Sequence, residues 1–83
     1  ARVNFRIQID TGNYAANGIA FDKAGSVIAV ACDDGFVKLF TEANGKLEAN
    51  LKGHEDCVQD VAFDHNSKML VSVGSDASFI VWQ

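Results

Sequence analysis

Short apolar segments alternate along the whole chain with clusters of Gly, Asn, Asp and Ser. Segments of about four to seven residues that are rich in Val, Ile, Phe and Leu and bounded by such clusters are typical of β-strands. No segment combines the apolar spacing and the capping residues that would indicate a helix. We therefore expect an all-β chain, with strands near residues 3–9, 18–22, 27–32, 36–40, 46–51, 58–63, 69–73 and 78–82.

The polar clusters between these segments predict tight turns. Asn44-Gly45 indicates a two-residue hairpin, because Asn and Gly both tolerate a positive φ. Asp33-Asp34-Gly35 indicates a second tight turn. Ala24-Gly25-Ser26 and Asn66-Ser67-Lys68 occupy an equivalent turn in two successive units of the chain.

The chain repeats itself after 42 residues, since Ile19-Ala20-Phe21-Asp22 is matched by Val61-Ala62-Phe63-Asp64. Size and polarity match through most of the repeat, although few residues are identical. A period of about 40–45 residues made of short strands is typical of the blades of a β-propeller. The further correspondences are Val27-Ile28-Ala29 with Met69-Leu70-Val71, Asp34 with Asp76, and Phe40 with Trp82.

Several predicted strands are apolar on both faces, as in Val27-Ile28-Ala29-Val30-Ala31. A simple sandwich of two sheets would leave one face of each sheet wetter. The blades of a propeller pack face to face, so that their inner strands are covered on both sides. The pattern therefore favours a propeller fragment of about two antiparallel four-stranded blades.

The second copy of the repeat has Gly53-His54 near its start and Trp82 at its end, with Ser72 and Asp76 between them. This arrangement resembles the WD repeat, which implies a hydrogen-bonded tetrad of His54, Ser72, Asp76 and Trp82. The chemistry of the groups agrees, because the indole N–H of Trp82 needs an acceptor when it is buried. Ser72 can accept that N–H and donate to His54, while Asp76 can bind the other imidazole nitrogen.

His54, Ser72 and Asp76 also have the composition of a catalytic triad. However, Ser72 lies within a predicted strand, without the sharp turn or the glycine-rich oxyanion loop that a nucleophilic serine needs. The sequence contains no nucleophile–base pair and no cofactor motif beyond these residues. We therefore expect a non-catalytic protein without a cofactor.

The first copy of the repeat has lost most of the tetrad. Thr11-Gly12 replaces Gly-His, Val30 replaces the serine and Phe40 replaces the tryptophan, so that only Asp34 remains. We expect this degenerate copy to depend on apolar packing, with Phe40 in the tryptophan's place.

In the WD-repeat family each sequence repeat is offset from the blade, which implies three segments here. Residues 1–9 are an outer strand of a preceding blade, residues 10–51 form a degenerate blade, and residues 52–83 supply three strands of a final blade. The closing strand of that blade comes from elsewhere. Because the chain starts with Ala1, we expect a piece of a larger propeller. Two blades leave wide apolar faces, so the remaining blades are expected partners.

The chain of 83 residues has a net charge of −4 and a pI of about 4.8. An acidic chain without a basic stripe is poorly suited to bind nucleic acid or an anionic membrane surface. Its longest apolar run, Val27–Cys32, is too short to span a bilayer, which takes about 20 residues. Cys32 and Cys57 lack zinc-site spacing, so we expect reduced thiols in an intracellular compartment.

Two clusters contain residue types that bind metals, but neither has the spacing of a metal site. His54, Glu55, Asp56 and Cys57 are consecutive, so their side chains diverge. Asp33-Asp34-Gly35 lacks the ligand spacing of a calcium loop. We therefore expect no metal, and we expect His65 to be solvated in a polar turn.

A narrower resemblance covers the whole chain and rests on several segments together with a degenerate repeat before a complete final one. The segments are Ile9-Asp10-Thr11-Gly12, Ala29–Gly35, Gly53-His54-Glu55 and Gly74-Ser75-Asp76. They are similar to the last two repeats of the sperm-associated antigen sixteen family. This implies a place in the cytoplasmic axoneme of motile cilia and flagella, with microtubule-associated partners of the central apparatus. Asn13-Tyr14 and Ala77-Ser78 depart from that family's pattern at two turns.

These observations leave three functions open. The first is a structural scaffold of the bridge between the central-pair microtubules of the cilium. The second is a WD-repeat adaptor of another assembly, such as a ubiquitin-ligase receptor or a signalling complex. The third is an excised two-blade unit that forms a homo-oligomer, in which residues 3–9 of one copy complete the last blade of another.

Overall fold

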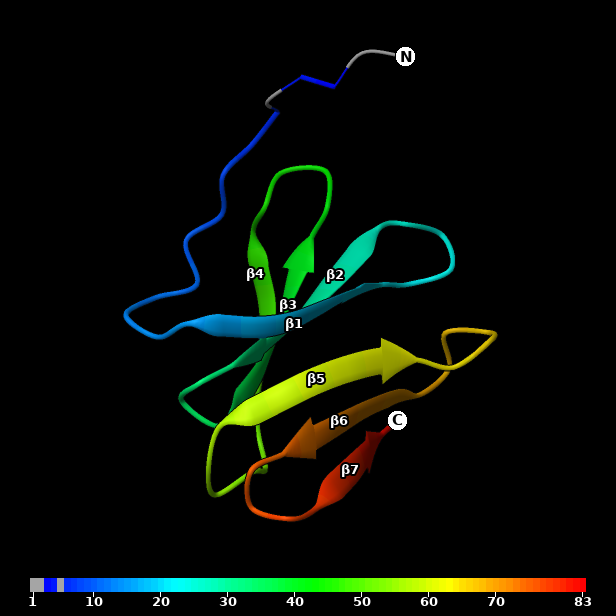
Figure 1. Ribbon diagram of the computed structural model, residues 1–83. Coiled ribbons are helices and arrows are strands. Elements are labelled where there is room, and N and C mark those ends of the chain that lie inside the picture. The colour runs from blue at the N-terminus through cyan, green and yellow to red at the C-terminus, as the bar shows by residue number, and fades with distance from the viewer. Residues whose placement is uncertain (1–2, 5) are drawn as a thin grey trace.

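A computed structural model describes residues 3–4 and 6–83, and these residues form two antiparallel sheets without a helix (Figure 1). The first sheet has the order β1-β2-β3-β4, and the second has the order β5-β6-β7. The expected all-β propeller fragment is therefore confirmed, with four and three strands in the two sheets. The strands are β1 (Ala16–Phe21), β2 (Val27–Cys32), β3 (Phe36–Thr41), β4 (Leu47–Lys52), β5 (Val58–Phe63), β6 (Leu70–Gly74) and β7 (Phe79–Trp82).

Seven of the eight predicted strands coincide with observed strands within a few residues, and the strand predicted for residues 3–9 does not. Residues 3–4 and 6–9 have no strand structure, while Ala1, Arg2 and Phe5 lie outside the described residues. The prediction is wrong for this part of the range because a strand exists only through pairing with a neighbour. These residues alternate between apolar and polar as a strand would, but no strand in the described part of the chain pairs with them.

The first hairpin of each sheet is closed by an equivalent aspartate, which shows the repeat at atomic detail. Asp22 Oδ1 accepts a hydrogen bond from the N–H of Val27 at 3.0 Å. Asp64 Oδ1 accepts the corresponding bond from Met69 at 2.9 Å. The Val27 N–H bond is the main reason why the pKa of Asp22 is lowered. A side chain that replaces a backbone acceptor in this way fixes the turn geometry.

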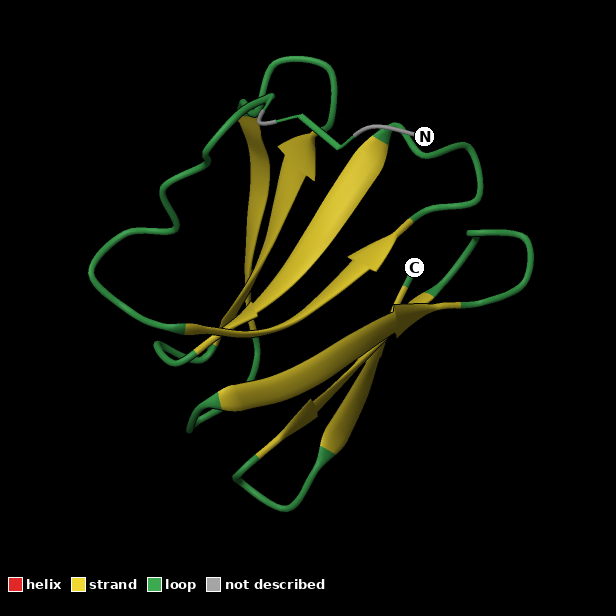
Figure 2. Ribbon diagram, turned by 45° about the horizontal axis from the view of Figure 1, so that its top comes forward, coloured by secondary structure: helices red, strands yellow, loops and turns green. Residues whose placement is uncertain are grey.

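The core lies between the two sheets, which pack face to face (Figure 2). Small residues on β2 allow the sheets to approach closely, and larger ones on β5 and β6 fill the remaining space. At Gly18 a Cβ atom would lie only 2.7 Å from Oδ1 of Asp60, so β1 and β5 meet almost backbone to backbone. The buried core residues are Ala29, Ala31, Val37, Val58, Val61 and Leu70.

A side-chain amide also joins the two sheets. Asn17 Nδ2 on β1 donates to the carbonyl oxygen of Val58 on β5 at 2.9 Å and to Asp33 Oδ1. The bond satisfies a backbone carbonyl at the sheet junction and fixes the relative position of β1 and β5. Apolar packing therefore supplies the contact area between the sheets, and the hydrogen bonds of Asn17 fix their relative position.

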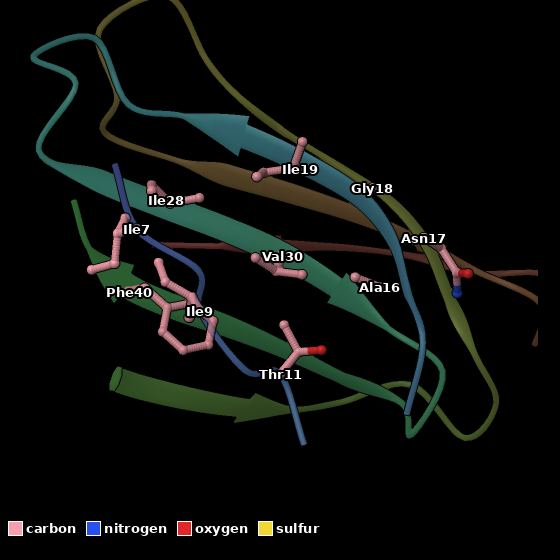
Figure 3. Close-up of a pocket in the computed structure, with 10 residues that line it drawn as sticks. All are labelled: Ile7, Ile9, Thr11, Ala16, Asn17, Gly18, Ile19, Ile28, Val30 and Phe40. Atoms are coloured by element: carbon pink, nitrogen blue, oxygen red, sulfur yellow. The ribbon is translucent and has the colours of Figure 1, made fainter. Parts of the chain in front are cut away.

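The outer face of the first sheet is partly covered by residues 6–11, which we call the N-terminal strap (Figure 3). Arg6 forms an ion pair with Glu42 at 2.6 Å, and Ile9 packs against a cluster that contains Val30 and Phe40. A hollow of about 550 Å³ remains between the strap and the sheet. The outer face of the second sheet is more open and exposes Val73, Phe79 and Val81.

Within the described part of the chain there is no helix that is long and apolar enough to cross a membrane.

Candidate functional site

The four residues of the predicted tetrad come from four positions around the second sheet. His54 lies in the connection between β4 and β5, and Ser72 lies in the middle of β6. Asp76 follows β6 in the tight turn that leads to β7, and Trp82 ends β7. The structure brings all four side chains together. The network therefore links both strands of the β6–β7 hairpin to the segment that precedes β5.

The hydrogen bonds of the tetrad run in a single direction. Trp82 Nε1 can only donate, and it lies 2.9 Å from Ser72 Oγ. The hydroxyl proton of Ser72 is then free to point at His54 Nε2, 2.8 Å away. The other ring nitrogen, Nδ1, lies 3.1 Å from Asp76 Oδ1 and donates to it. Each buried polar group thus has a partner, which a network in a poorly solvated interior requires.

The inner part of the network is closed to solvent. Ser72 is completely buried, and His54 is only 2% exposed. Ser72 Oγ already accepts the N–H of Trp82, so a substrate cannot approach the oxygen without unpacking β7. The trio of His54, Ser72 and Asp76 has the hydrogen-bond pattern of a catalytic triad, but its serine is buried, and the trio links the strands of the second sheet.

Asp76 binds more groups than the tetrad requires. Its carboxylate accepts Ser78 Oγ at 2.7 Å and the backbone N–H of Glu55 at 3.1 Å, besides His54. These bonds, led by the one from Ser78, lower the pKa of Asp76 to about 2. Ser78 was not among the predicted residues. Its position two residues after an aspartate in a turn was the available signal, because such hydroxyls often bind the turn carboxylate.

Gly53, predicted as a turn residue, is required for a different reason. A Cβ atom at this position would lie 2.7 Å from atoms of both Ile80 and Trp82. The φ of Gly53 is not in the left-handed region that favours glycine. Gly53 therefore makes room for the tryptophan and does not shape a turn.

The first sheet replaces the tetrad with a lysine. Lys38 Nζ on β3 lies 3.1 Å from Asp34 Oδ2, and it donates to the carbonyl oxygen of Thr11 at 2.8 Å. The side chains of Lys38 and Asp34 are only 12% and 16% exposed. Gly12 stands at the position equivalent to His54, and its lack of a side chain leaves space for the ammonium group.

This finding corrects the expectation that the degenerate copy depends on apolar packing alone. Phe40 is 4% exposed and Val30 is 6% exposed, so both are packed at the positions equivalent to Trp82 and Ser72. The ion pair between Lys38 and Asp34 adds a polar link at the place of the missing imidazole. The available signal was one lysine within an otherwise apolar strand.

The predicted turns agree with the structure to different degrees. Gly35 has a φ of 84°, and a Cβ there would lie 2.8 Å from the carbonyl oxygen of His54. Gly45 also has a positive φ, of 69°. The hairpin at Asn44, however, is not the two-residue turn that the sequence predicted. Thr41 N–H donates to the carbonyl of Lys46 at 2.8 Å, so the loop comprises residues 42–45.

The remaining candidate residues lie apart from this network. Cys32 and Cys57 are both free, and burial raises the pKa of each thiol. His65 is exposed in its turn. Among residues 3–4 and 6–83, no group of three or more His, Cys, Asp or Glu side chains is placed to hold a metal ion.

The chain is similar in sequence to parts of several longer proteins. Topless-related protein 4 of Arabidopsis thaliana is 32% identical over 82% of this chain and 6% of its own length. Nuclear distribution protein nudF 1 of Talaromyces marneffei is 32% identical over 98% of the chain and 18% of its own length. Elongator complex protein 2 of Dictyostelium discoideum is 38% identical over 66% of the chain and 6% of its own length. The chain thus spans less than a fifth of these relatives.

The family model described as WD domain, G-beta repeat matches residues 6–41 and 45–83. The two matched segments correspond to the two copies of the repeat, and they include both the tetrad and its lysine-containing counterpart. Together with the two stacked antiparallel sheets, this match shows that the chain belongs to the WD-repeat family.

Proposed function

We propose that the chain is part of a rigid, non-catalytic scaffold that binds other proteins through its loops. The observation that carries this proposal is the fixing of the loops at one end of the sheets by hydrogen bonds. Asp33 N–H donates to the carbonyl of Ala15, and Ser75 N–H donates to that of Cys57, both at 2.9 Å. Loops held in this way lose little conformational entropy when a partner binds, which favours recognition.

Substitutions in these loops test the scaffold proposal. Asp56→Lys changes an exposed residue of the β4–β5 connection, and Asn66→Lys changes an exposed residue of the β5–β6 turn. In the full-length protein we expect Asp56→Lys to weaken binding of the protein partners that co-purify with the unsubstituted form at least tenfold, with Asn66→Lys as the control. Equal partner binding by both variants would contradict recognition through the first set of loops.

The cellular place that we propose for this scaffold is the central apparatus of motile cilia and flagella. Support comes from the resemblance of Ile9-Asp10-Thr11-Gly12, Ala29–Gly35 and Gly53-His54-Glu55 to the sperm-associated antigen sixteen family. A degenerate repeat followed by a complete repeat strengthens that resemblance. The partners are then microtubule-associated proteins of the central-pair bridge, and the location is the cytoskeleton of the axoneme.

Imaging of the tagged full-length protein in multiciliated cells tests this assignment. We expect the signal along the axoneme and its retention there after detergent removes the ciliary membrane. A tagged soluble protein of similar size serves as the control for trapping within the cilium. A signal confined to the cell body, or one lost with the membrane, would refute the ciliary assignment and leave the scaffold proposal intact.

A second candidate is an adaptor in a different assembly. It is favoured by the 38% identity to Elongator complex protein 2, which is by name a subunit of a complex. Identification of the stable partners of the full-length protein by mass spectrometry separates the two candidates. Axonemal proteins among the partners support the first, and subunits of a non-ciliary complex support the second.

A further inference from the structure

The chain contains the dipeptide Asn-Gly twice, at Asn17-Gly18 and at Asn44-Gly45. The side-chain amide of an asparagine can be attacked by the backbone nitrogen of the next residue. Glycine allows this attack best, because it has no side chain to crowd the ring that forms. Both asparagines are exposed to solvent. A difference in reactivity between the two sites therefore depends on their surroundings in the fold.

The fold holds the amide of Asn17 in place. Its Nδ2 donates to the carbonyl oxygen of Val58 at 2.9 Å and also to Asp33 Oδ1. A Cβ atom on Gly18 would lie 3.1 Å from the Cα of Asp60 on β5, so the backbone here is in contact with the backbone of the other sheet. The peptide between Asn17 and Gly18 therefore cannot turn unless β1 and β5 separate.

The amide of Asn44 is held less firmly. Asn44 lies in the loop of residues 42–45 between β3 and β4 (Figure 1). Its Oδ1 accepts the backbone N–H of Lys46 at 3.0 Å, but no group among the described residues accepts a hydrogen bond from its Nδ2. This side-chain amide therefore turns more easily than that of Asn17.

The attacking nitrogen of Gly45 is also easier to free. Its N–H donates to the carbonyl oxygen of Thr41 at 2.7 Å, and this bond within the hairpin breaks when the peptide turns. The atoms nearest to a Cβ at Gly45 would belong to the side chains of Ile7 and Ile9, which can move aside. Ring closure here therefore requires a local opening of the loop, whereas at the first site it requires two sheets to separate.

The hydrogen bond from Lys46 also favours the attack itself. It withdraws electron density from Cγ of Asn44 and stabilises the negative charge that develops on Oδ1. At Asn17 the hydrogen bonds run from Nδ2 instead, and no group in the described part of the chain donates to its Oδ1. The structure thus both activates the carbonyl group of Asn44 and restrains the amide of Asn17.

We propose that Asn44 is a site of spontaneous deamidation in the folded protein and that Asn17 is protected from it. The backbone nitrogen of Gly45 loses its proton to water, and its electron pair forms a bond to Cγ of Asn44. The bond from Cγ to Nδ2 breaks, and the nitrogen leaves as ammonia after it takes up a proton. Water then opens the succinimide ring at one of its two carbonyl groups, which leaves either aspartate or isoaspartate. No oxidant or reductant takes part.

Both products change the hairpin of β3 and β4. Each adds one negative charge to a loop that already contains Glu42. Isoaspartate also lengthens the main chain by a methylene group, which displaces the bond of 2.8 Å from the N–H of Thr41 to the carbonyl oxygen of Lys46. The hairpin therefore changes with the age of each molecule. The reaction does not depend on the scaffold function or on the ciliary location, because its groups all lie within one hairpin.

Peptide mapping of the full-length protein tests the difference between the two sites. After incubation of the folded protein at neutral pH, trypsin releases residues 39–46 with Asn44 and residues 7–23 with Asn17. Mass spectrometry measures the conversion of amide to acid, and an enzyme that methylates isoaspartate labels that product. We expect at least about tenfold more conversion at Asn44, because opening at Asn17 breaks two further hydrogen bonds. Equal conversion, or more at Asn17, would overturn the proposal.

The same incubation in concentrated urea separates the effect of the fold from that of the sequence. The unfolded chain has the same dipeptide at both sites but lacks the contacts of Asn17, so we expect similar conversion at Asn17 and Asn44. A preference for Asn44 that persisted in urea would show that the neighbouring sequence selects the site, and it would refute protection by the fold.

Two glutamine variants identify the reacting residue. Asn44→Gln keeps an amide but would have to form a larger ring, so we expect the isoaspartate label in residues 39–46 to disappear. Asn50→Gln, at an exposed position of β4, is the matched control and should leave that label unchanged. An isoaspartate label that persisted in residues 39–46 of Asn44→Gln would contradict the assignment to Asn44.

Discussion

The two sheets differ both in the residues at their left-handed turn positions and in their polar networks. In the first sheet the left-handed positions of the β1–β2 and β2–β3 turns are Gly25 and Gly35, with φ of 74° and 84°. The equivalent positions of the second sheet are Ser67 and Ala77, with φ of 58° and 63°. A residue with a Cβ in this region costs about 1–2 kcal/mol. Ala77 directly follows Asp76, which indicates that the tetrad holds this strained turn in place. The turn at Ser67 is held instead by Asp64, whose Oδ1 accepts backbone N–H bonds.

The two sheets also anchor an equivalent aspartate to the loop before their first strand by different means. Asp76 is held by the imidazole of His54, which belongs to that loop. Asp34 is held by the ammonium group of Lys38, which reaches from β3 to the carbonyl of Thr11. The loop supplies the donor in one sheet and the acceptor in the other. Both sheets therefore have a polar link between this aspartate and the loop before their first strand, but different groups form the link.

Two equivalent buried positions also differ between the sheets, and they differ as a pair. Phe40 lacks the N–H of Trp82, and Val30 lacks the oxygen of Ser72 that would accept it. Loss of a donor together with its acceptor leaves nothing unpaired, and such paired replacements by apolar groups are nearly neutral. Loss of only one of them would leave a buried polar group without a partner. The comparison therefore predicts large effects for single substitutions in the tetrad.

The largest expected effect follows Ser72→Val, which gives the second sheet the residue that the first has at this position. The Trp82 N–H and His54 Nε2 both lose their partner, and each unpaired buried group costs about 1–3 kcal/mol. We expect the free energy of unfolding to fall by about 3 kcal/mol in urea titrations followed by circular dichroism. Ser72→Thr, which keeps a hydroxyl, is the control and should lose much less.

The double variant Ser72→Val with Trp82→Phe refines this prediction. Its loss should be smaller than the sum of the two single losses, because the N–H that Ser72→Val leaves unpaired is removed as well. Additive losses would show that the hydroxyl and the indole do not act as one unit.

Gly35→Ala is expected to have the next largest effect. The new Cβ would face the carbonyl oxygen of His54 at 2.8 Å and would sit on a φ of 84°. Strain of about 1–2 kcal/mol and the displacement of a neighbouring loop together should lower the free energy of unfolding by about 2–3 kcal/mol. Gly25→Ala has a similar φ with open space around it, so it measures the strain alone. Equal losses in the two variants would show that the contact with His54 is unimportant.

Lys38→Met tests whether the lysine has taken over the role of the tetrad in the first sheet. It leaves the carboxylate of Asp34 and the carbonyl of Thr11 without their shared donor. We expect a loss of about 2 kcal/mol, below the roughly 3–5 kcal/mol for a fully buried pair, because both side chains keep some contact with water. Lys46→Met, in an exposed turn, is the control. A loss no larger than that of the control would restore the view that apolar packing alone suffices.

Much of this arrangement could be predicted from the sequence. The repeat of 42 residues, its short apolar segments and its turns gave seven observed strands and the two sheets. The tetrad was predicted from the resemblance to the WD repeat, and the need of the Trp82 indole N–H for an acceptor agreed with it. Local pattern and side-chain chemistry were sufficient in these cases because the interactions repeat within one unit.

The unpredicted features depend on contacts between parts of the fold. Lys38 is most simply read as a solvent-facing residue of a strand, and its inward position depends on its contacts with Asp34 and with Thr11 in the loop before β1. Asn44-Gly45 fits a two-residue turn and also the longer loop that the structure has. The strap at residues 6–11 has a strand pattern, but a pattern does not supply the strand that it must pair with.

Acid should weaken the second sheet through Asp76, whose pKa is lowered from 3.8 to about 2 by its bonds to Ser78, Glu55 and His54. A group with a lowered folded-state pKa contributes stability above its unfolded pKa and loses it as the pH falls through the folded value. The difference in urea midpoint between the unsubstituted chain and Asp76→Asn should therefore shrink from pH 4 to pH 2. Asp22, whose pKa is also lowered, is present in both proteins and cancels. A constant difference over this range would contradict the role of the carboxylate.

The smallest expected effect has the opposite sign and follows Ala77→Gly, which gives the second sheet the glycine of the first. Glycine relieves about 1 kcal/mol or more of strain at a φ of 63°. Its greater freedom in the unfolded chain offsets part of this, so we expect the free energy of unfolding to rise by about 0.5 kcal/mol. Ser67→Gly, at a φ of 58°, is the matched comparison. Ser67 Oγ accepts a bond from the N–H of Lys23 at 2.6 Å, which joins the two sheets, so its removal should cancel the gain. If thermal unfolding showed that Ser67→Gly raises the stability and Ala77→Gly does not, the turn beside the tetrad would not be strained. The two sheets would then differ only in their hydrogen bonds.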